Sequence, residues 1–214
     1  MFEQCASVGW TLLDIEIPKV RGAWVCNGCS FKRPEEAVAE NFGQAGAQVS
    51  WCEGGSVNLL MKAASLDWLS QNVRRFGNPV TNYFEAQCKA HEARAHEIVD
   101  AIRSSDKART LANIDTLAAD ETLRRYYPRV TAEFMKALHG HVNTGLLGEI
   151  AELFVQSPYD YRSGWPDLIV LDGGELRFVE VKTTDFMHAS QLRFAREVAA
   201  PLQLDCEVIR VIAS

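Results

Sequence analysis

Two acidic residues and a lysine in the C-terminal part of the sequence have the types and spacing of a cation-dependent hydrolytic site. Asp167 directly follows Pro166, and Glu180 and Lys182 lie two residues apart in an apolar segment. Two carboxylates held close together in such surroundings repel each other, and a divalent cation relieves the repulsion. Carboxylate oxygens suit Mg²⁺ or Mn²⁺, and a neighbouring lysine can position water or stabilise charge on a phosphate. The three residues therefore predict phosphodiester cleavage.

The Glu-x-Lys pattern also has an ordinary explanation. On an exposed strand face, residues of opposite charge commonly form ion pairs that have no catalytic role. Two features of this sequence favour a site instead. The segment Gly164-Trp165-Pro166-Asp167 precedes Glu180 at the distance of a β-hairpin, and the residues that flank Glu180 are strongly apolar.

A hairpin must position these residues. Alternation of side chains and turn residues predicts a strand, a tight turn and a second strand, over Asp167–Leu171, Asp172-Gly173-Gly174 and Glu175–Val181. Phe178, Glu180 and Lys182 then share one face of the second strand. Because the hairpin is short, it brings Asp167 beside Glu180 at one end of the sheet.

Sites of this kind usually include a third carboxylate from an earlier element, and two residues compete for that place. Glu53 ends a strand expected over Gln48–Cys52, and the two glycines after it leave room for a turn and for a ligand. Glu149 lies at the border of the apolar stripe of a helix expected over Asn143–Gln156. The pattern alone leaves the choice between the two open.

The remaining elements indicate an α/β protein with a long helical segment. Two short strands are expected within residues 10–26, around Pro18 and Gly22. A helix begins at Pro34 and ends near Gly43 to Gly46, with Glu35 and Glu36 in its first turn, where carboxylates suit the helix dipole.

A helix over Asn58–Val73 is followed by helical patterns from Thr81 to about Gln156, with breaks near Asp120, Pro128 and Gly140. After the hairpin come a loop, a helix and a strand, over Thr183–His188, Ala189–Ala200 and Glu207–Ile212. This order predicts a mixed sheet in an α/β sandwich.

Composition narrows the class of protein. The 214 residues are 47% hydrophobic and 23% charged, and the net charge of −6 argues against a protein that coats nucleic acid. A nuclease needs only local basic surface, and candidates are Arg74 with Arg75, Lys107 with Arg109, and the group Arg124, Arg125 and Arg129. The sequence contains no membrane-length apolar run and begins with no signal-peptide pattern, so we expect a cytoplasmic protein.

Six cysteines are scattered through the chain, and two of them have the spacing of half a zinc site. Cys26 and Cys29 form a C-x-x-C pair, but no second pair and no H-x-x-x-H pattern follows. Cys5 and Cys52 are the residues that could complete a set of four ligands. The alternative is a hairpin turn that carries two thiols.

The C-terminal segment resembles the VRR-NUC branch of the PD-(D/E)xK nucleases. In that branch a G-x-P-D strand, an E-V-K strand and a helix with an early Gln follow in this order, and the matching residues here are Gly164, Pro166, Asp167, Glu180, Val181, Lys182 and Gln191. Residues 34–69 are similar to a segment of Fanconi-associated nucleases, in which a helix precedes a strand that ends in Glu-Gly. The resemblance places the first catalytic carboxylate on Glu53, not on Glu149.

The resemblance implies a restriction-endonuclease-like fold and a structure-specific DNA nuclease that uses Mg²⁺ or Mn²⁺ on flap or branched DNA in repair. Glu53, Asp167 and Glu180, with the Val181 carbonyl, are the expected cation ligands, and Lys182 is the catalytic cation. Gln191 is expected to support the site, and Arg193 and Arg196 to contact phosphates.

The resemblance also bears on domain organisation and assembly. We expect a single nuclease domain over residues 1–214, with strands within 10–33 and a mainly helical insertion over 58–160. The insertion favours a monomer. The alternatives are a dimeric Holliday junction resolvase and a catalytically idle DNA-binding module of the same fold.

Overall fold

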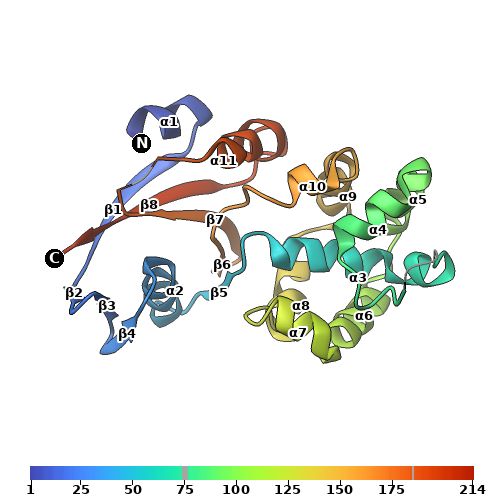
Figure 1. The fold of residues 1–214 in the computed structure, drawn as a ribbon, viewed down its shortest axis with the longest axis horizontal. Helices are drawn as coiled ribbons and strands as arrows, with labels where there is room; N and C mark the ends of the chain where they lie inside the picture. Colours follow the sequence, from blue (N-terminus) through green and yellow to red (C-terminus); the bar gives the residue numbers. More distant parts are fainter. Residues whose placement is uncertain (74–76, 185) are drawn as a thin grey trace. The chain divides into compact units, whose positions relative to one another are not determined.

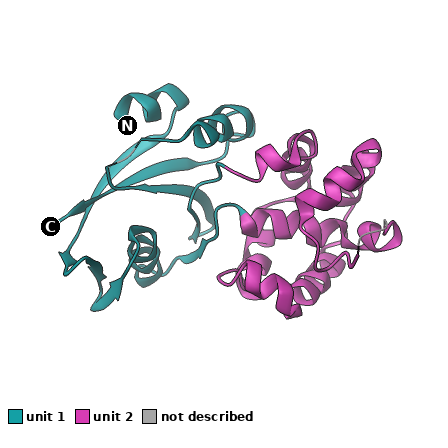
Figure 2. Cartoon of the chain, in the orientation of Figure 1, with its two compact units in different colours: residues 1–54, 164–214 teal, residues 55–163 magenta. Residues whose placement is uncertain are grey.

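The computed structural model describes residues 1–73, 77–184 and 186–214, and the chain forms two compact units (Figure 2). The first unit combines residues 1–54 with residues 164–214, and the second consists of residues 55–163. The chain therefore leaves the first unit directly after Glu53-Gly54 and returns to it at Gly164. None of the described helices has both the length and the apolar character that crossing a membrane requires.

A five-stranded mixed sheet is the centre of the first unit, as the sequence predicted (Figure 1). The strands lie in the order β1-β8-β7-β6-β5, with bounds Thr11–Ile17, Cys206–Ala213, Glu175–Lys182, Leu168–Asp172 and Gln48–Trp51. β8 is parallel to both β1 and β7, whereas β6 is antiparallel to β7 and to β5. The α/β fold class is confirmed.

The predicted hairpin is β6–β7. Gly173 and Gly174 form its two-residue turn, and both have positive φ values, of 56° and 97°, as the tight hairpin turns that match strand twist require. The register pairs Asp172 with Glu175 and Leu168 with Val179. One step beyond the last pair, this register places Asp167 opposite Glu180.

Helices cover both faces of the sheet (Figure 1). On one face lies α2 (Pro34–Gln44), which packs on an apolar cluster that includes Val38, Val170 and Val179. The other side carries α1 (Phe2–Val8) and α11 (Ala189–Phe194), and α11 continues as a π-helical turn over Ala195–Ala199. The helix expected over Ala189–Ala200 is therefore confirmed, with its second half wound more loosely than an α-helix.

A small three-stranded sheet follows β1 in the chain. It consists of β2 (Lys19–Val20), β3 (Ala23–Cys26) and β4 (Cys29–Phe31). Cys26 and Cys29 face each other across a two-residue turn, so the hairpin interpretation of this pair is confirmed. Among the described residues no three His, Cys, Asp or Glu side chains are placed to hold a metal ion, so the structure does not bring Cys5 and Cys52 together with this pair.

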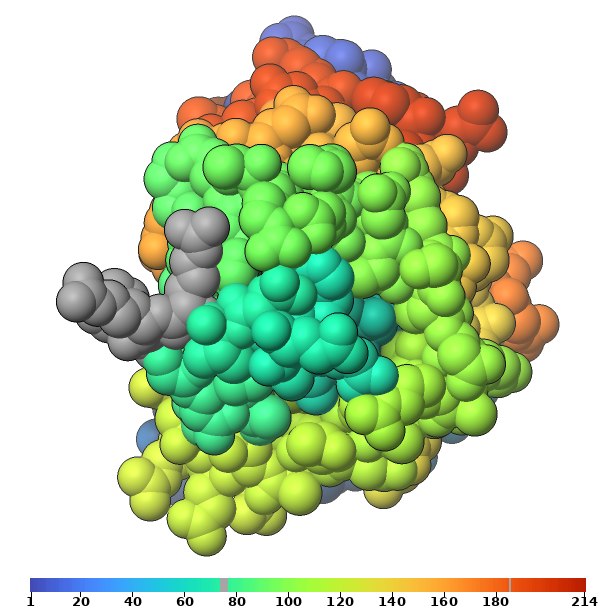
Figure 3. Space-filling view, turned by 90° about the vertical axis from the view of Figure 1, so that its right-hand side faces the viewer, coloured from blue at the N-terminus to red at the C-terminus, as the bar shows by residue number. Residues whose placement is uncertain are grey.

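The second unit is helical, as predicted. Its α-helices are α3 (Gly55–Gln71), α4 (Phe84–Ala90), α5 (Ala95–Arg103), α6 (Lys107–Ala119), α7 (Glu121–Tyr126), α8 (Ala132–His141), α9 (Thr144–Phe154) and α10 (Pro158–Tyr161), with a short 3₁₀ turn, η1 (Glu92–Arg94), before α5. α3 is buried on almost every side, and its C-terminal end reaches the surface between the later helices (Figure 3). Whether the two units act as one nuclease domain stays a prediction.

The expected helix breaks near Asp120 and Pro128 are confirmed, and the break expected near Gly140 is present but begins only after His141. The Asp120 carboxylate accepts a hydrogen bond from the Leu123 N–H at 2.9 Å and so caps α7. α8 continues through Gly140 to His141. The break comes at Asn143, whose side chain accepts from the Leu146 N–H at 2.8 Å, because a capping side chain starts α9 there.

Candidate metal centre

Asp167 and Glu180 form a buried carboxyl pair at the end of the β6–β7 hairpin. Burial, followed by repulsion from Glu180, raises the pKa of Asp167 to about 8. Burial also raises the pKa of Glu180, which is only 1% exposed. The two carboxyl groups are close enough to hydrogen bond when one of them is protonated. Without a cation, the pair therefore retains a proton well above the usual carboxyl range.

Neighbouring groups fix both carboxyls in place. The Val181 N–H donates to Asp167 Oδ2 at 2.9 Å. Lys182 Nζ lies 3.0 Å from Glu180 Oε1, and both side chains of this ion pair are buried. Burying two opposite charges is costly unless they are paired and hydrogen bonded, so this arrangement differs from the exposed ion pair that was the ordinary explanation of the Glu-x-Lys pattern.

Gln191 connects the site to the start of α11. Its Oε1 accepts a hydrogen bond from the His188 N–H at 2.8 Å, which completes a capping box. Its Nε2 donates to Glu180 Oε1 at 2.5 Å. Because the backbone bond occupies the amide oxygen, the amide nitrogen must point at Glu180, and the helix start thereby orients that carboxylate.

Two glycines permit the close packing around the site. A Cβ on Gly164 would meet the backbone oxygen of Ser190, at the start of α11, at 2.2 Å, and one on Gly54 would lie 2.3 Å from the Trp165 ring. Both glycines also have positive φ values, of 89° and 80°, which side-chain-bearing residues rarely adopt. Only glycine at position 164 lets the chain approach α11 this closely.

The structure places the two candidates for the third carboxylate differently. Glu53 belongs to the first unit, directly after Cys52 at the end of β5, and has a positive φ of 46°. Its side chain is exposed. Glu149 lies on α9 in the second unit and is also exposed. Neither Glu53 nor Glu149 forms a group of metal ligands with Asp167 and Glu180, because among the described residues no three His, Cys, Asp or Glu side chains are placed to hold a metal ion.

A carboxylate that the sequence-based prediction of the site missed lies at the start of α2. Glu35 is half-buried, and its charge contributes to raising the pKa of Asp167. Its Oε2 atom is buried and has no hydrogen-bond partner among the described residues. In the sequence, Glu35 looked like one of two first-turn acids that suit a helix dipole, so no local pattern separated it from Glu36.

The residues expected to contact DNA lie on several elements. On the α11 side of the first unit, Arg193 is half-buried and Arg196 is exposed. In the second unit, Arg109 forms a two-pronged ion pair with Asp67, at 2.6 and 2.8 Å, while Arg124 and Arg125 are exposed on α7. The expected cluster at Arg74 and Arg75 lies outside the described residues.

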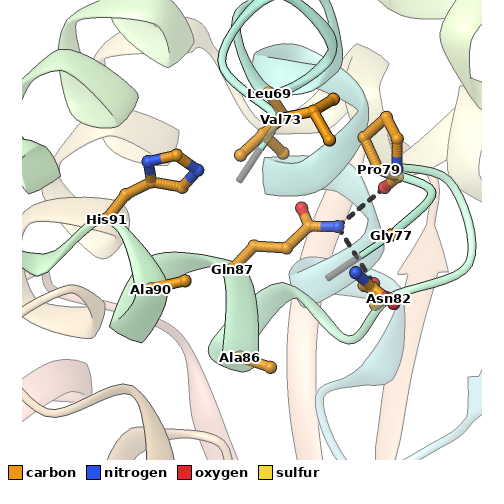
Figure 4. Close-up of a pocket in the computed structure, with 9 residues that line it drawn as sticks. All are labelled: Leu69, Val73, Gly77, Pro79, Asn82, Ala86, Gln87, Ala90 and His91. Atoms are coloured by element: carbon orange, nitrogen blue, oxygen red, sulfur yellow. Dashed lines mark hydrogen bonds between the residues drawn. The ribbon is translucent and has the colours of Figure 1, made fainter. Parts of the chain in front are cut away.

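The second unit also contains an apolar cavity of about 300 Å³ (Figure 4). The Gln87 amide nitrogen donates to the carbonyls of Pro79 and Asn82 at its edge, at 2.8 and 3.3 Å. Leu69, Val73 and Ala86 contribute apolar wall. No carboxylate is among the described residues that line the cavity, and His91 is the one lining residue there of a metal-binding type, so the cavity does not have the paired carboxylates of the hairpin site.

The donor set of the Asp167–Glu180 pair fits a hard divalent cation. With both carboxyls ionised, Glu180 Oε2 is buried and has no donor among the described residues. An unsatisfied buried carboxylate oxygen is costly and requires an explanation. A bound cation compensates the charge of both carboxylates, so that the pair no longer has to retain a proton. Carboxylate oxygens are the ligands that Mg²⁺ and Mn²⁺ prefer.

Similarity to known proteins is confined to the fold. No model of a protein family matches the sequence, and no curated protein matches it. Among solved structures, paFAN1 bound to 5′ flap DNA with a gap matches with a TM-score of 0.63, both for a 2-nucleotide flap at 20% identity and for a 1-nucleotide flap at 18% identity. Each match covers 96% of this chain and 38% of the paFAN1 chain. The fold is therefore that of FAN1 nucleases, in a chain that spans well under half their length.

Proposed function

We propose that the protein is a metal-dependent DNA nuclease that cleaves flap or branched DNA. The observation that carries the proposal is the buried Asp167–Glu180 pair with Lys182 ion-paired beside it. Burying two carboxyls that repel each other costs free energy and contributes nothing to packing, whereas a bound divalent cation compensates this cost. The likeness of the fold to paFAN1, which was crystallised with 5′ flap DNA, supports DNA as the substrate.

Each residue has a distinct part in the proposed reaction. Asp167 and Glu180, with the Val181 carbonyl and, by resemblance, Glu53, would hold Mg²⁺ or Mn²⁺, and the cation would supply activation of water and stabilisation of charge on the scissile phosphate. Lys182, with its Nζ 3.0 Å from Glu180 Oε1, favours the ionised form of that carboxylate and would stabilise charge on the phosphate. Gln191 orients Glu180 through the bond from its amide nitrogen.

Cleavage of a substrate panel tests the proposal. Labelled flap, fork, four-way junction and single-stranded DNAs are incubated with the protein in Ca²⁺, and reactions are started with Mg²⁺ or Mn²⁺. We expect cleavage of flap or forked DNA by the wild type and none by Asp167→Asn, which keeps an acceptor for the Val181 N–H. Paired, symmetrical cuts in the four-way junction would support the resolvase alternative, and binding without cleavage of any DNA would support the idle module.

The third ligand is tested by comparing Glu53→Gln with Glu149→Gln. By resemblance, Glu53→Gln loses cleavage by several orders of magnitude and Glu149→Gln by little. Because both side chains are exposed, neither substitution removes a packing contact, and the difference in activity reports on chemistry. An inactive Glu149→Gln beside an active Glu53→Gln would show that the assignment by resemblance is wrong.

A further inference from the structure

The start of α2 brings a carboxylate to the Asp167–Glu180 pair from the face of the sheet opposite to α11. α2 lies against the sheet on the face of Val38 and Val179, and Glu35 is in its first turn. After burial and the charge of Glu180, the charge of Glu35 also contributes to the raised pKa of Asp167. Gln191 reaches Glu180 from α11. The first turns of two helices, one from each layer, thus converge on one end of the hairpin.

Capping of α2 does not account for Glu35. The helix start already has a capping box, in which the Glu36 carboxylate accepts a hydrogen bond from the Arg33 N–H at 3.2 Å. Glu35 is half-buried, and its Oε2 has no hydrogen-bond partner in the described part of the chain. A first-turn acid that served only the helix dipole would lose nothing by pointing into water.

A second, independent observation is the unsatisfied oxygen of Glu180. That side chain is 1% exposed, and its Oε2 also has no partner among the described residues. In the metal-free pair Asp167 can share a proton with Glu180; once both carboxyls are ionised, Glu180 Oε2 and Glu35 Oε2 are two buried oxygens without a donor among the described residues, and a ligand must supply what they lack. A cation with its bound water molecules supplies positive charge for one oxygen and hydrogen-bond donors for the other.

The local charges favour a divalent cation. Glu180, Glu35 and Lys182 act on Asp167, and the proposed ligand Glu53 adds a further carboxylate. Carboxylates therefore outnumber the one ammonium group, and a divalent cation reduces this excess of negative charge. Asp167, Glu180 and Glu35 do not have the spacing of direct ligands to a single ion. Mg²⁺ usually keeps several of its water molecules in proteins, and such a water can bridge the remaining distance.

We propose that Glu35 is a positioning residue of the metal centre, whose carboxylate accepts a hydrogen bond from a water molecule bound to the cation at Asp167 and Glu180. The inference rests on the proposed function, because it requires a cation at this pair. It adds a group that neither the motif nor the residue spacing indicated. It also assigns a role to the α2 layer, which otherwise contributes packing to the site.

Calorimetric titration with Mn²⁺ in the absence of DNA tests the inference. We expect Glu35→Gln to weaken Mn²⁺ binding about tenfold, the lower end of the range for groups that act through a metal's direct ligands. Glu36→Gln, one residue further along the same helix, is the matched control and should bind as the wild type does. Asp167→Asn should show no measurable binding. Thermal melts in a chelator establish that each variant is folded.

The outcomes separate this inference from the proposed function. Absence of Mn²⁺ binding by the wild type would overturn both. Binding by the wild type with equal affinity in Glu35→Gln and Glu36→Gln would overturn the inference and leave the proposed function standing. A loss in Glu35→Gln as complete as that in Asp167→Asn would overturn the water-mediated role, because it would make Glu35 a direct ligand.

Discussion

The buried pair of Asp167 and Glu180 makes the metal-free protein sensitive to pH in a defined direction. The pKa of Asp167 is about 8 in the folded protein, against a value near 3.8 when the residue is unperturbed. The folded state therefore binds a proton that the unfolded state releases. The stability that this proton contributes is complete below the unfolded pKa and is lost as pH rises through the folded pKa.

This linkage predicts the behaviour of Asp167→Asn. In a chelator, the melting temperature of the wild type should fall relative to that of the variant between about pH 4 and about pH 8, because the variant lacks the Asp167 carboxyl that must lose its proton over this range. Mn²⁺ should raise the melting temperature of the wild type only, since a ligand stabilises the state that binds it. Parallel pH dependence of the two proteins would contradict the burial of a titrating pair.

Gln191 offers a second test at the scale of single residues. It contacts Glu180 and the His188 N–H through opposite ends of its amide. We expect Gln191→Ala to lower kcat by about 10- to 100-fold, the usual cost of losing a group that orients a metal ligand, with KM for DNA little changed. A raised KM with unchanged kcat would instead mean that Gln191 contacts the DNA.

At the level of secondary structure, the start of α11 positions Gln191 beside Glu180. Close packing of Gly164 against Ser190 in turn holds the start of α11 in place. Gly164→Ala places a Cβ 2.2 Å from the Ser190 backbone oxygen, at a φ of 89°. Backbone strain and overpacking together should destabilise the protein by about 2 to 4 kcal/mol. Chemical denaturation measures this loss, and cleavage should fall with it because Gln191 moves with the helix.

Gly43→Ala is the matched control for this substitution. Gly43 lies inside α2, its φ is not positive, and a Cβ there meets nothing within 4 Å. Alanine favours a helix interior over glycine by about 1 kcal/mol, so this variant should be slightly more stable than the wild type. Equal stability of Gly164→Ala and the wild type would mean that α11 does not pack closely against Gly164.

The same helix and its π-helical turn carry the predicted phosphate contacts. If Arg193 and Arg196 each neutralise one phosphate, the double substitution Arg193→Ala with Arg196→Ala weakens DNA binding and makes its salt dependence shallower. The slope of log affinity against log salt should change by about 0.9 for each lost contact on a duplex. An unchanged slope in this variant, with a reduced slope in Arg124→Ala with Arg125→Ala, would assign the phosphate contacts to the helical unit.

At the scale of the whole molecule, the second unit is inserted between residues of the proposed site. The chain enters it directly after Glu53-Gly54 and leaves it at Gly164, three residues before Asp167. Each of the two connections between the units therefore lies within a few residues in sequence of a proposed metal ligand, Glu53 or Asp167. We expect light scattering during gel filtration to give the mass of one chain without DNA, and the mass of one chain plus one DNA molecule when flap DNA is bound. A dimer whose dissociation abolishes cleavage would favour the resolvase alternative.

Local sequence patterns are enough to predict the hairpin and the residues at its end. Alternation along β6 and β7 and the Gly173-Gly174 turn depend on neighbouring residues, so Asp167, Glu180 and Lys182 could be placed together before the tertiary structure was known. The order of later elements followed for the same reason, and so did the mixed sheet. The exact helix limits were less accurate, as at Gly140, because competing caps decide them.

Long-range packing selects the distant groups that reach the Asp167–Glu180 pair. Glu35, Glu36, Glu53 and Glu149 are all acids near the ends or edges of elements, and no local pattern ranks them. Packing of α2 on the sheet brings Glu35 to Asp167, while the division into units leaves Glu149 on α9 of the helical one. The burial that raises the pKa of Asp167 likewise comes from residues far apart in the chain, so spacing alone could not reveal it.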